Sequence, residues 1–147
     1  MTEFNAFEVV NTRLLPFPQA KVFAAFAEPD QLAVWWGPDG FTNEVVAFEL
    51  EVGGRFEIVM INENDRRFEN VKRFTEVVAP ERVVFEHIEP VHHFLMTHIF
   101  KQVGEDQTEL TWLMQFAGDG DNADLKDFLH AANEQNFDRL EAHLQTL

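Results

Sequence analysis

Residues 68–116 read FENVKRFTEVVAPERVVFEHIEPVHHFLMTHIFKQVGEDQTELTWLMQF, and this stretch decides the fold. Apolar and polar side chains alternate along it, which is typical of strands that bury one face. Four strands are predicted at residues 68–78, 82–88, 94–103 and 108–116. The breaks between them are short and rich in Pro, Gly and Asp, as in hairpin turns. Successive strands joined by tight turns pair antiparallel, so this stretch predicts a meander.

Upstream of the meander, the sequence predicts three further strands and two short helices. The strands are expected at residues 7–15, 41–48 and 55–61. Each is rich in β-branched and aromatic residues and is followed by Pro, Gly or Asn. Between the first two strands, apolar residues recur at helical spacing from Pro18 up to Pro29, and Asp30 is expected to cap a second short helix that carries Trp35 and Trp36.

Downstream of the meander, the chain predicts one long amphipathic helix. The segment from Gly118 to Asn122 breaks the strand pattern, and its acidic side chains suit the positive N-terminal end of a helix that runs to about Leu147. Its apolar face is expected to carry Leu125, Phe128, Leu129, Ala132, Leu140, Leu144 and Leu147. Such a face must lie on another apolar surface, and the sheet is the only one large enough. The fold class is therefore α+β.

The composition limits the classes of function. The chain has 147 residues, which fits one domain spanning 1–147. It contains sixteen Phe and three Trp but no Tyr, so almost all of its aromatic side chains are apolar and are expected to be buried. A formal charge of −15 opposes binding to nucleic acid or to anionic membranes. There is no cysteine, no export signal at the start and no apolar run long enough to span a membrane, so we expect a cytoplasmic location.

Four strings resemble a known family. They are WWGP with FT at residues 35–42, LEVGGRF at 50–56, APERVVF at 79–85 and TELT at 108–111. In this order they resemble the START-like, or SRPBCC, superfamily, in the branch named for the activator of heat-shock protein ATPase (AHSA-like). The resemblance implies a helix-grip fold, in which a curved antiparallel sheet of about seven strands wraps around the C-terminal helix. It also implies an apolar cavity between the two. Family members include lipid or hormone carriers, polyketide aromatase/cyclases and co-chaperones.

Two histidines are expected to point into this cavity. The resemblance to the family aligns Phe100 with an inward position, which implies that His98 also faces inward, and the same alternation places His87 on the inner face of the preceding strand. If the hairpin turns midway between His92 and His93, these two imidazoles lie opposite each other. Three interpretations stay open: structural histidines, groups that orient a ligand's carbonyl or hydroxyl, or metal ligands with Glu86 or Glu89 as a third donor.

Two asparagines on the terminal helix also fall on its apolar stripe. A buried amide costs about 1–3 kcal/mol unless it is paired, so Asn133 and Asn136 must bond to water, to a strand backbone or to a ligand. The complete set of expected ligand-binding residues is His87, His98, Trp112, Met114, Met96, Phe85, Phe100, Asn133, Asn136 and Trp36.

Three functions follow from this pattern. The first is binding of a hydrophobic or aromatic small molecule, lipid-like or polyketide-like, in the cavity. The second is a cyclase or hydrolase that uses a cavity histidine as general base; no catalytic residue is singled out, and the chain contains no serine for a Ser triad. The third is a chaperone-accessory module that binds protein. No cofactor or metal is expected, and a homodimer remains open.

Overall fold

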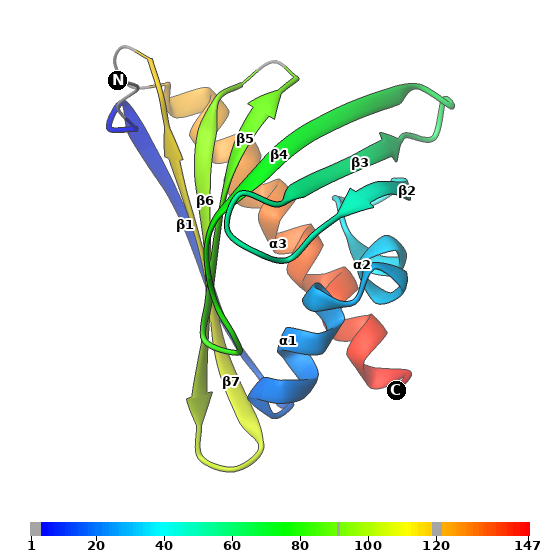
Figure 1. Ribbon diagram of the computed structural model, residues 1–147, viewed down its shortest axis with the longest axis vertical. Helices are drawn as coiled ribbons and strands as arrows, with labels where there is room; N and C mark the ends of the chain where they lie inside the picture. Colours follow the sequence, from blue (N-terminus) through cyan, green and yellow to red (C-terminus); the bar gives the residue numbers. More distant parts are fainter. Residues whose placement is uncertain (1–3, 91, 119–121) are drawn as a thin grey trace.

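The computed structural model describes residues 4–90, 92–118 and 122–147 (Figure 1). Seven antiparallel strands form one curved sheet in the order β1-β7-β6-β5-β4-β3-β2. Their bounds are β1 Phe7–Leu15, β2 Thr42–Phe48, β3 Arg55–Ile61, β4 Arg67–Val78, β5 Arg82–Glu89, β6 Phe94–Val103 and β7 Gln107–Phe116. These strands confirm the prediction made from the sequence. That prediction rested on the alternation of side chains, which indicates the ones that face the interior.

Three helices accompany the sheet. They are α1 (Gln19–Ala27), α2 (Pro29–Trp35) and α3 (Ala123–Gln145). Figure 1 shows the long α3 running alongside the sheet, with α1 and α2 next to it. Together with the sheet they form the predicted α+β helix-grip fold. No helix among the described residues is long and apolar enough to cross a membrane.

The helix starts differ in detail from the prediction. Asp30 does not cap α2; it lies in the first turn, and Glu28 occupies the N-cap position without a side-chain hydrogen bond. Pro29 can begin the helix because the first helical position needs no N–H donor. The side chain of Asn122 caps α3 by accepting a hydrogen bond from the Leu125 N–H at 3.0 Å. The acidic residues 119 and 121, expected near this end, lie outside the described residues.

The register of the β5–β6 hairpin corrects one expectation. His87 pairs with Phe94 and not with His98, which instead pairs with Val83. The reason is the position of the turn: the His92 N–H donates to the Pro90 carbonyl at 2.8 Å, so the chain reverses next to Pro90, earlier than the expected midpoint at His92 and His93. The predicted cross-strand imidazole pair is therefore wrong, although both rings are buried.

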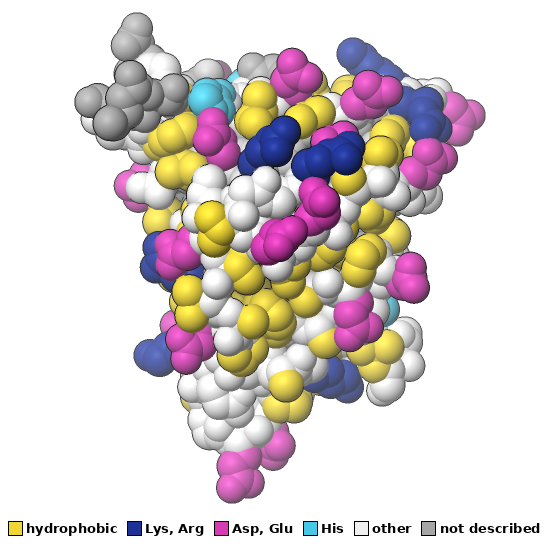
Figure 2. All heavy atoms as spheres, viewed as in Figure 1, with side chains coloured by type: hydrophobic (Ala, Val, Ile, Leu, Met, Phe, Trp, Pro, Cys, Tyr) yellow, Lys and Arg dark blue, Asp and Glu magenta, His cyan; other side chains and the backbone are white. Residues whose placement is uncertain are grey.

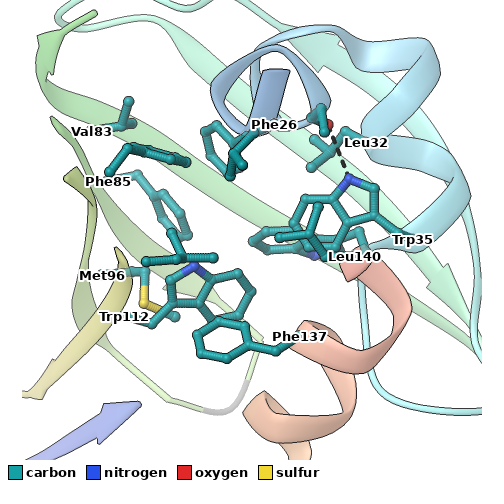
Figure 3. Packing of buried hydrophobic residues seen from close by; sticks show 14 of the residues in the cluster. Phe26, Leu32, Trp35, Val83, Phe85, Met96, Trp112, Phe137 and Leu140 are labelled. Carbon is teal, nitrogen blue, oxygen red and sulfur yellow. Dashed lines mark hydrogen bonds between the residues drawn. The ribbon is translucent and has the colours of Figure 1, made fainter. Parts of the chain in front are cut away.

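The C-terminal half of α3 seals one end of the sheet. Figure 3 shows side chains of α1, α2, the sheet and α3 pointing toward one another in a dense cluster. The Trp112 and Phe137 rings meet edge to face with centroids 5.0 Å apart. The indole N–H of Trp35 donates to the Ala25 carbonyl at 3.0 Å, which satisfies the polar atom of this buried ring. This half of the interior is closely packed and apolar.

The expected apolar face of α3 differs from the structure at its end. Leu147 lies beyond the end of the helix and is 59% exposed, whereas Phe137, which the prediction omitted, is completely buried. Phe128 is 69% exposed but lies on the expected side of the helix, where it borders the space between α3 and the sheet. Arg13 on β1 fixes the middle of α3 through ion pairs with Glu134 and Asp138 at 3.1 and 2.8 Å.

Candidate functional site

A cavity of about 360 Å³ lies where the N-terminal half of α3 faces the sheet. Its sheet wall is formed mainly by Phe68, Asn70, Lys72, Phe85, His87 and Trp112. Methionines from three strands, Met60, Met96 and Met114, complete this wall. The opposite wall comes from α3, with Leu129, Ala132, Asn133 and Asn136, and from the turn that follows α2. A volume of this size falls within the range of ligand pockets, roughly 300–1,000 Å³.

The two halves of α3 meet the sheet differently. In the C-terminal half, large side chains such as Phe137 and Leu140 face the sheet and are buried. In the N-terminal half, Ala132 and Asn133 are short, and the larger Phe128 borders the space while remaining 69% exposed. The cavity therefore lies where the side chains of α3 do not fill the distance to the strands.

The predicted ligand-binding residues divide into two groups. The cavity wall includes Trp36, Phe85, His87, Met96, Trp112, Met114, Asn133 and Asn136. His98 and Phe100 do not reach the wall, because they pack toward α1: the His98 ring meets Phe26 at 4.6 Å and Phe100 meets Phe23 at 5.1 Å between centroids. The hairpin shift explains part of this separation, since His98 lies four residues from Phe94, the partner of His87.

The two buried histidines are uncharged at neutral pH. Burial, together with the nearby Lys72 charge, lowers the pKa of His87 to about 4. Its Nε2 lies 3.2 Å from the Pro90 carbonyl, which can only accept, so Nε2 carries the proton and Nδ1 is left as an acceptor without a partner among the described residues. Burial also lowers the pKa of His98 well below its usual value, and neither ring nitrogen of His98 has a hydrogen-bond partner in the described part of the chain.

Within the described residues, neither of these imidazoles has a carboxylate partner that could orient it as a general base. Glu86 pairs instead with His93, which is not part of the wall, and Glu89 is exposed. Within the described residues, no three His, Asp or Glu side chains lie close enough to hold a metal ion.

The two helix asparagines bond to the protein itself. The Asn136 amide oxygen accepts from the Gly37 N–H at 2.7 Å and thereby ties the turn after α2 to α3. The Asn133 amide donates to Asn11 Oδ1 at 3.1 Å, which ties β1 to the same helix. Both residues therefore position the cavity walls, and both also line the space between them.

Sequence reasoning missed Lys72, the one Lys or Arg among the buried residues that the structure describes. It lies on β4, is only 3% exposed and contributes to the cavity wall. Its Nζ has no hydrogen-bond partner in the described ranges of the chain and lies 4.1 Å from the Phe56 ring centroid and 4.9 Å from that of Trp36. Burial lowers its pKa to about 7. A signal was available, because Lys72 shares the parity of Phe68 and Phe74, both inward-facing positions of a strand.

The comparison with protein families identifies the relatives of this chain. Residues 16–145 match the model of the family described as Activator of Hsp90 ATPase homolog 1-like protein. The chain belongs to this family. This assignment confirms the resemblance carried by the four sequence strings and places the AHSA1-like chain in the START-like, or SRPBCC, superfamily. A comparison with curated protein sequences gives no match.

Solved structures show the same fold at low sequence identity. A protein from Chromobacterium violaceum has a TM-score of 0.82 at 20% identity, over 93% of this chain and 96% of its own. A protein from Arthrobacter aurescens has a TM-score of 0.85 at 18% identity, over 100% and 91% of the two chains. The AHSA1 protein from Silicibacter pomeroyi has a TM-score of 0.80 at 18% identity, over 95% and 99%. These likenesses establish the architecture of the AHSA1-like chain.

Proposed function

We propose that this AHSA1-like protein binds a hydrophobic or aromatic small molecule, lipid-like or polyketide-like, in the cavity between its sheet and α3, and that it acts in the cytoplasm. The observation that carries the proposal is the cavity of about 360 Å³, whose wall is made largely of aromatic rings and methionines. Apolar walls with a few polar groups are typical of small-molecule sites. Methionine side chains adapt to ligands of different shape, which suits such a wall.

The expected affinity follows from apolar burial. Enclosing about 200 Å² of ligand surface contributes some 5 kcal/mol at ~25 cal/mol per Å². Contacts with the wall are added to this, while lost translational and rotational freedom of the ligand opposes it. Micromolar affinity is therefore expected without any special contact.

The two alternative functions have less support. An enzyme with a histidine general base needs a ring that is basic near neutral pH, whereas burial lowers the pKa of His87 to about 4. A chaperone-accessory module needs a continuous apolar surface for its partner. The large exposed apolar side chains of the described residues are instead distributed over several elements, for example Val10 on β1, Val34 on α2 and Val46 on β2.

A pair of substitutions on α3 tests the proposal. Ala132 lines the cavity, whereas its neighbour Ala131 is exposed. Titration with 1-naphthalenemethanol, followed by the fluorescence of Trp36 and Trp112 on the wall, is expected to saturate for the unchanged protein and for Ala131→Phe. Ala132→Phe should lose binding because its ring fills the space. Equal binding by both variants would mean that the ligand lies elsewhere, and no binding by the unchanged protein would refute the proposal.

A further inference from the structure

Lys72 lies in the middle of a row of rings that crosses the sheet. The strand register aligns, one per strand, Phe48, Phe56, Lys72, His87, Phe94 and Phe116. Paired residues of antiparallel strands share a face, so these side chains stand side by side on the inner face. The His87 and Phe94 rings are stacked with centroids 4.6 Å apart, and Phe94 and Phe116 follow at 5.0 Å. The amine of Lys72 is thus enclosed by apolar groups.

This amine has no counter-ion within the part of the chain that the structure describes. Its Nζ makes no hydrogen bond, and its closest favourable contacts are ring faces: Phe56 at 4.1 Å, Trp36 at 4.9 Å and Phe85 at 5.5 Å. Ring faces attract a cation, but they do not replace the hydrogen bonds that three N–H donors lose on leaving water. An anion at this position would supply them.

Among the residues that the structure describes, the cavity wall carries no acidic side chain that could do so. The ionisable residues of this described wall are Lys72, His87 and His92, although the whole chain has 26 Asp and Glu. Acidic side chains are instead spread over the outside, as the face in Figure 2 shows. Four arginines form ion pairs with carboxylates, namely Arg13, Arg55, Arg67 and Arg82. The buried amine thus faces a cavity whose described wall has no carboxylate, although the chain as a whole is acidic. An anionic ligand could bind there and pair with this amine.

We propose that the ligand of this cavity is an apolar carboxylic acid whose carboxylate pairs with the ammonium of Lys72. This inference rests on the proposed function and names the class of ligand. Lys72 is part of the wall, and its four-carbon stem can turn Nζ toward the cavity space. One ammonium balances one negative charge, which favours a monocarboxylate over a dianionic phosphate. The hydrophobic remainder of the acid would lie against the methionines and Trp112.

The two buried histidines do not replace Lys72 in this role. His87 lies on the wall and His98 lies behind it, but burial keeps both rings uncharged at neutral pH. The proton of His87 is committed to the Pro90 carbonyl, so its Nδ1 repels a carboxylate and can only accept a hydrogen bond, for example from Lys72. His92 is half-buried at the turn after β5, so Lys72 is the buried group of the described wall that can supply a positive charge.

The test compares two ligands of nearly equal shape on the full chain at pH 6.5. Calorimetric titrations with 1-naphthoic acid and with 1-naphthalenemethanol are made on the unchanged protein, on Lys72→Met and on Lys101→Met, which alters an exposed lysine of β6. The unchanged protein and Lys101→Met should bind the acid at least tenfold more tightly than the alcohol. Lys72→Met should lose this preference and still bind the alcohol, because methionine retains an apolar side chain of similar length.

A second measurement needs no variant. Because Lys72 has a pKa of about 7 before the ligand binds, the acid should bind roughly 20-fold more weakly at pH 8.5 than at pH 6.5, while the alcohol should change little. If Lys72→Met fails to fold, this pH dependence of acid binding tests the carboxylate assignment by itself.

The outcomes separate the two proposals. Three results would overturn the carboxylate assignment and leave the binding function intact. They are equal affinities for the acid and the alcohol, a preference for the acid that survives in Lys72→Met, and an acid affinity that does not change with pH. Failure of both ligands to bind would overturn both.

Discussion

Replacing Lys72 with methionine should stabilise the ligand-free protein, and most strongly below pH 7. In the folded chain, burial lowers the pKa of Lys72 from 10.5 to about 7. Between these two values the unfolded chain therefore binds more protons than the folded chain, so the free energy of unfolding rises with pH across this window. Below pH 7 both states are protonated at Lys72, and the folded state bears the full cost of burying the charge.

The size of the effect follows from the same shift. A difference of one pKa unit corresponds to about 1.4 kcal/mol, so burial alone would cost about 5 kcal/mol. Part of this difference lies outside the range from pH 6 to pH 10, because the two titrations are not complete within it. The stability advantage of Lys72→Met over the unchanged protein should thus be about 4 kcal/mol greater at pH 6 than at pH 10.

Urea unfolding followed by circular dichroism at pH 6, 7, 8, 9 and 10 measures this difference. Groups distant from Lys72 ionise alike in both proteins and cancel in the comparison. His87, whose pKa the Lys72 charge lowers, has a pKa of about 4 and stays uncharged over this pH range. Lys101→Met serves as the control, since its amine is exposed, and its curve should run parallel to that of the unchanged protein. Curves for Lys72→Met and the unchanged protein that also run parallel from pH 6 to pH 10 would refute the reasoning, because they would mean that the amine is already well solvated or paired.

Two further substitutions test the contacts that shape the cavity. Asn136→Ala removes the acceptor of the buried Gly37 N–H, so the free energy of unfolding should fall by about 1–3 kcal/mol, and the affinity for 1-naphthalenemethanol should fall as well. A stability equal to that of the unchanged protein would show that water replaces the amide. Gly54→Ala would place a Cβ atom 1.9 Å from the Glu49 carbonyl oxygen, so the melting temperature should fall by several degrees, and an unchanged value would contradict the tight approach of these two backbones.

The sheet could be predicted because local patterns determine it. The observed bounds of β3 and β6 coincide with the expected ones, since both segments are rich in β-branched and aromatic residues and a clear turn follows each strand. The β5–β6 register could not be predicted, because the sequence between Pro90 and Phe94 allows more than one turn position. A shift within such a loop changes every cross-strand pair, which is why the pairing of His87 with His98 was wrong.

The candidate site was harder to predict than the fold. Apolar wall residues such as Trp112 and Met114 follow from alternation, whereas the depth of the cavity depends on how α3 packs over them. Lys72 was overlooked because a charged side chain in a strand is ordinarily assigned to the outer face. Lys72 lies two residues before Phe74 and therefore on the same face of the strand, which contradicts that assumption. Because this inner face is buried by the helices, the Lys72 side chain lies in the interior.

Methyl NMR of the methionines tests the central claim, that a ligand enters the space under α3. The chain has four methionines, and Met60, Met96 and Met114 all lie on the cavity wall. With their ε-methyl groups labelled with carbon-13, titration with 1-naphthalenemethanol should shift the signals of all three, because an aromatic ring would come to lie against them. Signals of Met60, Met96 and Met114 that stay unchanged at saturating ligand would contradict the account.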